Sequence, residues 1–230
     1  MRTTTALLGL AVLCLTGCQT IQNSSPSQTL VRVIDASYNA PPVDVKIGTT
    51  PIAVDIGAAT FTNYAFLPPE NATAYVYPTK ATTATASVAG AFLVTQQHSV
   101  FITDTSTGYQ ATLLLDQAVL PPAGYVSLRF LQQAPRAGAV DIYLIASTGT
   151  FTGAKPLLSH VPPATVSGYV NVQAGSYTLA IAPAGDTNPN DVYTSESLQF
   201  TAEQVRSVLI MDAQLTTNPP VTIAIGNDLN

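Results

Sequence analysis

The chain has 230 residues, of which 47% are hydrophobic and only 9% are charged, and its formal net charge is −5. Globular proteins carry about 25% charged residues, so this sequence predicts a surface dominated by uncharged polar groups. The acidic balance, with 8 Lys and Arg against 13 Asp and Glu, argues against nucleic-acid binding. Trp is absent from the sequence, whereas Val, Thr and Tyr, which favour strands, are abundant.

Residues 1–17 have the layout of a secretory signal peptide. Arg2 is followed by an apolar run over residues 6–15 and then by the small residues Thr16 and Gly17. The run is too short to cross a bilayer as a helix, which needs about 20 residues. We therefore expect this segment to be removed on export, with cleavage between Gly17 and Cys18.

The segment Leu15-Thr16-Gly17-Cys18 resembles the lipobox of bacterial lipoproteins. The resemblance implies that the Cys18 thiol carries a diacylglycerol and that fatty acyl chains such as palmitate hold the protein on a membrane, since stable attachment needs at least two chains. In enterobacterial lipoproteins an Asp after the lipidated Cys resembles an inner-membrane retention signal. Gln19 stands at that position here, which favours the outer membrane of the cell envelope if the cell is Gram-negative. The alternatives for Cys14 and Cys18 are weaker, because a disulfide across this gap is sterically awkward and a metal site needs further ligands.

Residues 18–29 are polar and Ser-rich and predict a flexible tether. Strand-like runs then alternate with Pro, Gly and Asn turns to the end of the chain, without helical periodicity except for a short helical turn near 202–205. The chain is therefore predicted to be all-β, with two tandem immunoglobulin-like β-sandwich domains over residues 30–119 and 124–230. The predicted strands are 30–35, 43–47, 64–67, 74–77, 98–104, 111–115, 126–131, 140–144, 168–172, 177–182, 206–211 and 221–225.

Five Pro-Pro pairs punctuate these runs. Because Pro lacks the N–H that a sheet ladder needs, the pairs are predicted to lie at turns and strand edges. The pair within "LPPAGY" (120–125) marks the predicted domain boundary, and this short link favours a fixed angle between the domains. The pairs are at residues 41–42, 68–69, 121–122, 162–163 and 219–220.

The two halves of the chain contain three matching blocks in the same order, which indicates tandem domains. Residues 31–47 match 126–144, with Asp44 matched to Asp141. Residues 98–104 match 206–212. Residues 64–78 match 169–183, with Tyr64 matched to Tyr169 and Tyr75 to Tyr177.

The first block resembles the domain of unknown function 4397. Members of this family carry a strand with Arg, followed by His-Ala-Ser-Pro-x-Ala-Pro-x-Val-Asp-Val; here Arg32 is followed by "DASYNAPPVDV" at 35–45. Asp35 replaces the usual His and Tyr38 the usual Pro, and the second copy keeps only Ala-Pro at 134–135 and Val-Asp at 140–141. The resemblance covers nearly the whole mature chain and implies an immunoglobulin-like sandwich in a bacterial envelope or secreted protein, with no established activity.

Asp44 and Asp141 are candidate site residues because each follows a Pro-containing loop at the start of a strand. They would either contact a ligand or ion, or accept backbone N–H groups and brace the loop. The flanking Val residues favour the structural role. A calcium loop is a second candidate, but it lacks the Gly and Glu that such a loop needs at its sixth and twelfth positions. An Asx-rich hairpin loop is favoured there, and no metal or cofactor is expected. The calcium candidates are Asp186, Asn188, Asn190 and Asp191.

His98 and His160 are the only histidines, and no nucleophile elbow or phosphate loop accompanies them. We therefore expect a non-enzymatic scaffold, adhesion or partner-binding module whose partners are envelope proteins or glycans. The alternative is a carbohydrate-binding module, which a line of exposed tyrosines on one sheet would support and buried tyrosines would remove. A hydrolase would need one of the histidines in a cleft beside a hydroxyl and a carboxylate. The candidate tyrosines are Tyr64, Tyr75, Tyr77, Tyr169 and Tyr177.

Overall fold

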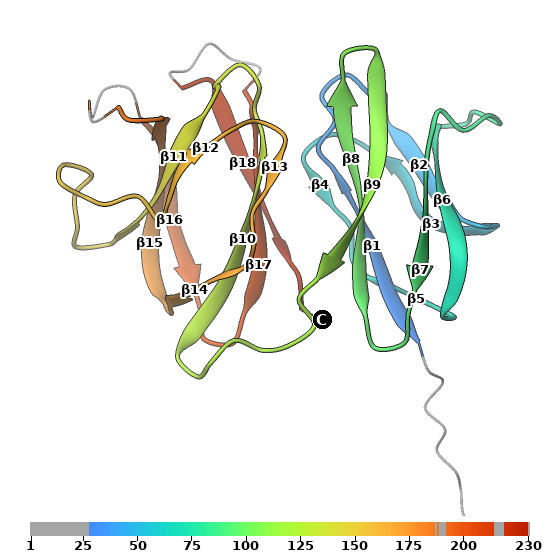
Figure 1. The fold of residues 1–230 in the computed structure, drawn as a ribbon, viewed down its shortest axis with the longest axis horizontal. Coiled ribbons are helices and arrows are strands. Elements are labelled where there is room, and N and C mark those ends of the chain that lie inside the picture. The colour runs from blue at the N-terminus through green and yellow to red at the C-terminus, as the bar shows by residue number, and fades with distance from the viewer. Residues whose placement is uncertain (1–27, 187, 189–191, 214–218, 230) are drawn as a thin grey trace, which may run out of the picture.

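The computed structural model describes residues 28–186, 188, 192–213 and 219–229. The regular secondary structure of these residues consists of strands alone. The strands form four sheets arranged as two sandwiches side by side (Figure 1). The predicted all-β fold with two tandem sandwiches is confirmed. The described part of the chain contains no helix that is long and apolar enough to cross a membrane.

The first sandwich consists of one five-stranded and one four-stranded sheet. The five-stranded sheet contains β1 (Thr29–Asp35), β4 (Thr60–Phe61), β5 (Ala65–Leu67), β8 (Gln97–Thr105) and β9 (Gly108–Asp116). The four-stranded sheet contains β2 (Val43–Ile47), β3 (Thr50–Ile56), β6 (Glu70–Pro78) and β7 (Ala86–Phe92).

The second sandwich repeats this topology strand for strand. Its five-stranded sheet contains β10 (Tyr125–Gln133), β13 (Thr165–Val166), β14 (Val170–Gln173), β17 (Val205–Asp212) and β18 (Val221–Asn227). Its four-stranded sheet contains β11 (Val140–Ala146), β12 (Leu158–Val161), β15 (Gly175–Pro183) and β16 (Tyr193–Phe200). In the described residues two strand pairs are parallel, β1 with β8 and its equivalent, β10 with β17.

Each predicted strand overlaps an observed one, and all five Pro-Pro pairs lie between strands as predicted. Six observed strands were not predicted: β3, β7, β12 and β16, which are the edges of the four-stranded sheets, and the two-residue strands β4 and β13. Strand β7 reads ASVAGAF, and its Ala and Gly residues have low β-propensity. The predicted helical turn near 202–205 is wrong, because a simple turn there leads into β17 at Val205.

Each sandwich has its own apolar core, and a third apolar layer lies between the two sandwiches. The first core contains Val31 and Val33 of β1, whereas Ile34 from the opposite face of β1 joins the layer between the sandwiches. Strands buried on both faces tend to read as apolar runs, which fits the sequence VLIM in β17. Strand β8 is also buried on both faces but includes the buried polar residues Gln97, His98 and Ser99. The buried residues of the third layer are Ile34, Ala36, Phe101, Leu131, Leu209 and Met211.

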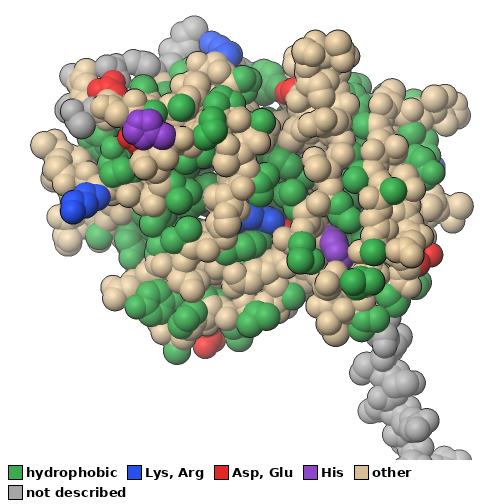
Figure 2. Space-filling view, in the orientation of Figure 1, with side chains coloured by type: hydrophobic (Ala, Val, Ile, Leu, Met, Phe, Trp, Pro, Cys, Tyr) green, Lys and Arg blue, Asp and Glu red, His purple; other side chains and the backbone are tan. Residues whose placement is uncertain are grey.

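The visible surface carries few charged side chains, and they are scattered rather than gathered (Figure 2). This agrees with the low proportion of charged residues in the sequence.

The two sandwiches also touch where Phe61 of β4 packs over Gly226 of β18. A Cβ added at Gly226 would meet the Phe61 ring, whereas one added at Gly57 would meet nothing within 4 Å. Gly226→Ala is expected to reduce the free energy of unfolding by about 1–3 kcal/mol through overpacking. Urea denaturation measures the loss, with Gly57→Ala as the matched control. Equal stability of the two variants would contradict close contact of the sandwiches at this point.

Candidate functional site at the interface of the two sandwiches

Arg32 projects from β1 toward the second sandwich and is fully buried. Its Nε donates to Ser99 Oγ at 2.8 Å, within its own sandwich. Its two terminal nitrogens cross the interface, where Nη2 donates to Asp228 Oδ1 at 2.5 Å and Nη1 to the Asn227 carbonyl at 2.6 Å. The guanidinium lies 4.9 Å from the centroid of the Tyr64 ring. Every nitrogen of this buried cation therefore has a hydrogen-bond acceptor.

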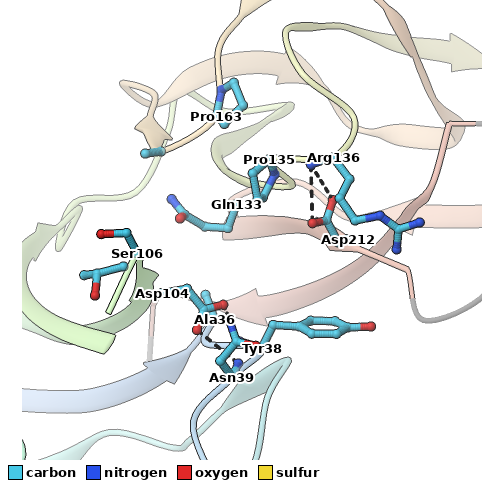
Figure 3. A pocket seen from close by; sticks show the side chains of 12 residues that line it. Ala36, Tyr38, Asn39, Asp104, Ser106, Gln133, Pro135, Arg136, Pro163 and Asp212 are labelled. Carbon is cyan, nitrogen blue, oxygen red and sulfur yellow. Dashed lines mark hydrogen bonds between the residues drawn. The ribbon is translucent and has the colours of Figure 1, made fainter. Parts of the chain in front are cut away.

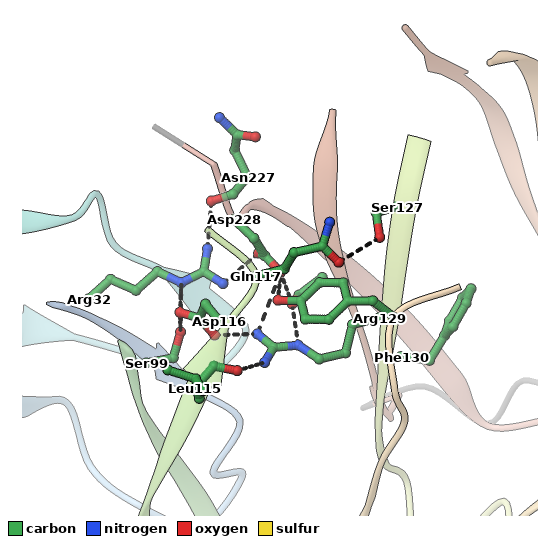
Figure 4. Close-up of polar contacts among 12 residues, drawn as sticks. Arg32, Ser99, Leu115, Asp116, Gln117, Ser127, Arg129, Phe130, Asn227 and Asp228 are labelled. Atoms are coloured by element: carbon green, nitrogen blue, oxygen red, sulfur yellow. Dashed lines mark hydrogen bonds and ion pairs between the residues drawn. The ribbon is translucent and has the colours of Figure 1, made fainter. Parts of the chain in front are cut away.

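Arg129 repeats this arrangement from β10 of the second sandwich. Its Nε donates to Ser207 Oγ at 2.9 Å, and its Nη2 crosses to Asp116 Oδ1 at 2.7 Å. Its Nη1 lies 3.5 Å from the Leu115 carbonyl. Its guanidinium lies 4.8 Å from the centroid of the Tyr169 ring. Arg32 and Arg129 are thus equivalent residues in equivalent surroundings (Figure 4).

The two carboxylates complete a reciprocal exchange of charge between the sandwiches. Asp116 accepts Ser99 Oγ at 2.6 Å and Tyr64 OH at 2.7 Å from its own sandwich. Asp228 accepts the equivalent groups of the second sandwich, Ser207 Oγ at 2.5 Å and Tyr169 OH at 2.7 Å. Each arginine therefore pairs most closely with the aspartate of the opposite sandwich, the pattern of a two-fold symmetric interface. Each also lies near the aspartate of its own sandwich, at 3.8 Å for Arg32 and 3.5 Å for Arg129. We call these eight residues the exchange cluster: Arg32, Tyr64, Ser99, Asp116, Arg129, Tyr169, Ser207 and Asp228.

The exchange cluster contains two cations and two anions, all buried. Burial raises the pKa of the Tyr64 and Tyr169 phenols, and the negative charge of the nearby aspartate, Asp116 for Tyr64 and Asp228 for Tyr169, raises it further. Both phenols therefore remain protonated hydrogen-bond donors. Removing four charges from water carries a large desolvation cost, so such a cluster adds less net stability than its contacts suggest. It does penalise any other alignment of the two sheets, because a shifted alignment would leave buried charges unpaired.

An open cleft of about 500 Å³ lies at the end of the interface where β1, β8, β10 and β17 finish (Figure 3). One wall comes from the first sandwich and includes Tyr38 and Asp104. The opposite wall comes from the second sandwich and includes Gln133, Arg136 and Asp212. The cleft therefore exists only while the two sandwiches keep their relative position.

The two aspartates of the cleft each hold a loop of their own sandwich. Asp104 accepts the backbone N–H groups of Tyr38 at 2.6 Å and Asn39 at 3.0 Å. Asp212 accepts the N–H of Arg136 at 3.1 Å. Burial raises the pKa of Asp212, while its hydrogen bond from Arg136 opposes the shift. The loops that line the cleft are thus fixed by side chains at the ends of β8 and β17.

Asp44 and Asp141 lie away from the cleft and act on the backbone in equivalent ways. Asp44 accepts the N–H of Asp55 at 2.8 Å, and Asp141 accepts the N–H of His160 at 2.7 Å and of Gly185 at 2.9 Å. Asp55 and His160 have positive φ angles of 53° and 54°. The carboxylates therefore brace a strained residue on the neighbouring strand.

Of the calcium candidates, Asn190 and Asp191 lie outside the described residues, as do Gly17 and Cys18 of the predicted lipidation site. Asp186 accepts the N–H of Asn188 at 2.8 Å in an Asx turn. No cluster of three or more His, Cys, Asp or Glu side chains that could hold a metal occurs in the described residues.

The two histidines lie in different sandwiches and in contrasting surroundings. His98 is buried, packs edge-on against Phe92 with ring centroids 5.4 Å apart, and has its pKa lowered by that burial. His160 has a largely exposed side chain, with Nδ1 3.7 Å from Asp141 Oδ1. Neither histidine lines the interdomain cleft.

The tyrosines divide into two groups. Tyr64 and Tyr169 are equivalent, as the matched blocks predicted, and belong to the exchange cluster. The match of Tyr75 to Tyr177 is wrong: with Pro78 equivalent to Pro183, the two lie three positions apart. Tyr177 packs against the second core. Tyr75 and Tyr77 share the outer face of β6, with ring centroids 6.5 Å apart.

Sequence reasoning missed most of the exchange cluster and the cleft. The signal was present in the matched blocks, because Arg32 precedes Asp44 by the same interval by which Arg129 precedes Asp141. A charged side chain at the same place in an apolar strand of both copies indicates a buried pair. Its partners, Asp116 and Asp228, lie far along the chain at the ends of β9 and β18, where no local pattern identifies them.

The fold and the exchange cluster define a class of protein: a tandem β-sandwich whose two domains are joined as one body by equivalent residues. The sequence profile of a domain of unknown function, DUF4397, matches residues 29–143, half of the chain. The chain belongs to the DUF4397 family. The match ends within β11, so it covers less than the expected resemblance over nearly the whole mature chain; the second copy has lost most of the motif.

Among solved structures, the chain is similar to a crystal structure from Bacteroides uniformis that is provisionally described as a cell adhesion protein. The two share 11% identity, the similarity covers 87% of this chain and 98% of the other, and the TM-score is 0.25. No protein with a curated description matches this chain.

The exchange cluster predicts a large and symmetric loss on removing either anion. Asp116→Asn and Asp228→Asn should each lower the free energy of unfolding by about 3–5 kcal/mol, since each removes one of the two anions that neutralise two buried arginines. Urea denaturation measures both losses. Asp55→Asn, at an exposed aspartate, is the control and should change stability by less than about 0.5 kcal/mol. A loss near the control value in either variant would refute the reciprocal pairing.

Asp35 is a buried carboxyl group whose effect on stability should depend on pH. It is buried, its Oδ2 has no hydrogen-bond partner, and burial raises its pKa above the ordinary value of 3.8. Its contribution to stability is therefore fully present below pH 3.8 and is lost as pH rises through the folded-state pKa. The equivalent Gln132 is a neutral amide that accepts the N–H of Ala134 at 2.7 Å, as Asp35 accepts that of Ser37 at 2.9 Å.

Asp35→Asn should thus raise the free energy of unfolding at pH 7, because the neutral amide avoids the cost of burying the carboxylate charge. The gain should shrink as pH is lowered toward 4, because wild type then protonates the carboxyl. Urea midpoints measured between pH 4 and pH 7 test this, again beside Asp55→Asn. A variant that is less stable than wild type at pH 7 would show that the Asp35 charge is not costly.

Proposed function

We propose that this chain is a lipid-anchored protein of the bacterial cell envelope that acts without catalysis, as a rigid scaffold whose interdomain cleft binds a partner. The observation that carries the proposal is the cleft itself, which is built from equivalent loops of both sandwiches. The lipobox-like sequence at residues 15–18 supports the anchor, and the family supplies no catalytic residues.

The cleft lies at the end of the molecule opposite the start of β1. It is lined where β1 and β8 finish, at Ala36 and Asp104, whereas residue 28 joins the first strand at the other end. An anchor before residue 28 would therefore leave the cleft facing away from the membrane. A binding surface in that position is accessible to other molecules of the envelope.

The side chains at the cleft suit a partner that offers both hydrogen-bonding groups and a flat apolar group. Tyr38 is 38% exposed, and Gln133 faces it from the second sandwich. Tyrosine supplies a large contact area at low entropic cost, which is why it is common at binding sites. A neutral amide and a phenol impose no charge on the partner, in keeping with the low overall charge.

Glycan binding is the second candidate, and a specific observation favours it. On the outer face of β6, Tyr75 is exposed and Tyr77 is half-buried beside it, and the Lys46 ammonium lies 5.2 Å from the Tyr77 ring. Aromatic faces of this kind can stack on sugar rings. The other candidate tyrosines are removed from this role: Tyr64 and Tyr169 serve the exchange cluster, and Tyr177 is packed against the core.

Two matched variants distinguish these functions. Tyr38→Ala should weaken capture of an envelope partner by about tenfold, and a photo-crosslinker placed at Gln133 should label that same partner. Tyr75→Ala, at a residue of similar exposure, should leave capture unchanged. Unaltered capture by Tyr38→Ala would refute the cleft as the site. Saturable binding on a glycan array that only Tyr75→Ala removes would assign function to the outer face instead.

A further inference from the structure

Large apolar side chains are exposed together at the end of the molecule where β1 begins. Phe66 is 61% exposed, Leu93 51% and Val94 41%, and in the link between the sandwiches Val119 is 72% and Leu120 53% exposed. We call these five residues the basal rim. Leu115 and Tyr125, which are 60% and 36% exposed, flank the link.

The hydrogen-bond register places the rim residues at one end. Phe66 pairs with Leu30 at the start of β1, and the turn after Val94 contacts the same point, since Thr95 N–H donates to the Gln28 carbonyl at 3.1 Å. Gln97, which begins β8, pairs with Asp116, directly before the link that carries Val119. In Figure 1 the link and the start of β1 both lie along the lower edge.

The chain enters the fold at this end, below the first sandwich (Figure 1). Ten residues separate Cys18 from Thr29, and a fully extended chain of that length spans at most about 36 Å. Strand β8 has nine residues and is about 30 Å long. An anchor at Cys18 therefore keeps the basal rim within reach of a bilayer and leaves the cleft about one strand length farther out.

We propose that the basal rim rests on the lipid surface, so that the anchored protein stands with its cleft directed outward. This inference rests on the lipid anchor of the proposed function. Apolar side chains at a bilayer interface bury themselves about 5–10 Å into the headgroup and acyl boundary. Four of the rim residues lie between strands, and Phe66 lies in the short strand β5 with its side chain exposed. Their side chains can therefore enter the boundary without unpairing a sheet.

The anchor also makes a weak contact sufficient. A tether of this length holds the rim at a high local concentration relative to the bilayer, so that insertion becomes an intramolecular step. The exposed charges near the rim are the acidic Glu70 and Glu203. The surface is therefore not adapted to an anionic membrane by basic residues, and the contact is expected to depend on apolar insertion and to persist at high salt.

The absence of Trp from the sequence allows a direct test on the full chain, expressed in a lipidating bacterial host. Single tryptophans are introduced as Phe66→Trp and Leu120→Trp in the rim and as Tyr38→Trp at the cleft. Each protein is reconstituted into phosphatidylcholine vesicles with or without brominated acyl chains. Emission of both rim tryptophans should be about twofold lower with bromolipid, as expected for rings at the acyl boundary, and that of Tyr38→Trp should be unchanged.

Three results would overturn the proposal, and each points to a different cause. If the intact mass of the purified chain lacks the added mass of the acyl chains and equals that of a processed, unlipidated control, both the anchor and the docking are refuted. A lipidated chain whose rim tryptophans remain unquenched and open to iodide would remove the docking alone. If the rim tryptophans are protected from iodide but are not quenched by bromolipid, and light scattering gives a doubled mass, the rim contacts a second copy of the chain instead of the bilayer. Circular dichroism of each variant verifies folding.

Discussion

The reciprocal pairing of Arg32 with Asp228 and of Arg129 with Asp116 is the constraint on which the rest of this structure depends. Each pair joins a strand near the start of one sandwich to the last residues of the other. A buried charge that loses its partner is far more costly than the pair is favourable. The two sandwiches therefore have one low-energy arrangement, and the interface behaves as part of the fold.

Three layers follow from this arrangement along the interface. The exchange cluster lies toward the end where β1 begins, the apolar layer around Ile34 and Leu209 comes next, and the cleft opens beyond it. The order reflects the alternation of side chains along β1, where Arg32, Ile34 and Ala36 face the partner sandwich in turn. Strand β1 and the residue that follows it thus contribute to the exchange cluster, to the apolar layer and to one wall of the proposed binding site. Strand β10 contributes to the same three features from the second sandwich.

Much of the fold could be predicted because its signals are local. Strand alternation, Pro-Pro turns and the matched blocks located most strands and the tandem sandwiches, and they placed Asp44 and Asp141 at equivalent positions. The interface could not be predicted in this way. An Arg in a strand ordinarily faces solvent. The face of β1 that carries Arg32 is buried only because the sheet of the second sandwich packs against it, and the Asp228 that pairs with Arg32 is nearly 200 positions away in the sequence.

Rigid coupling of the two sandwiches by the exchange cluster can be measured directly as a distance between them. Spin labels at Ser87 of β7 and Glu196 of β16, exposed positions on the outer sheets, in a chain with both cysteines changed to serine, report the distance between the sandwiches. If the exchange cluster holds the sandwiches as one rigid body, pulsed dipolar spectroscopy should give a single narrow distance distribution, which should broaden in Asp228→Asn. A broad distribution in the chain without that substitution would contradict rigid coupling.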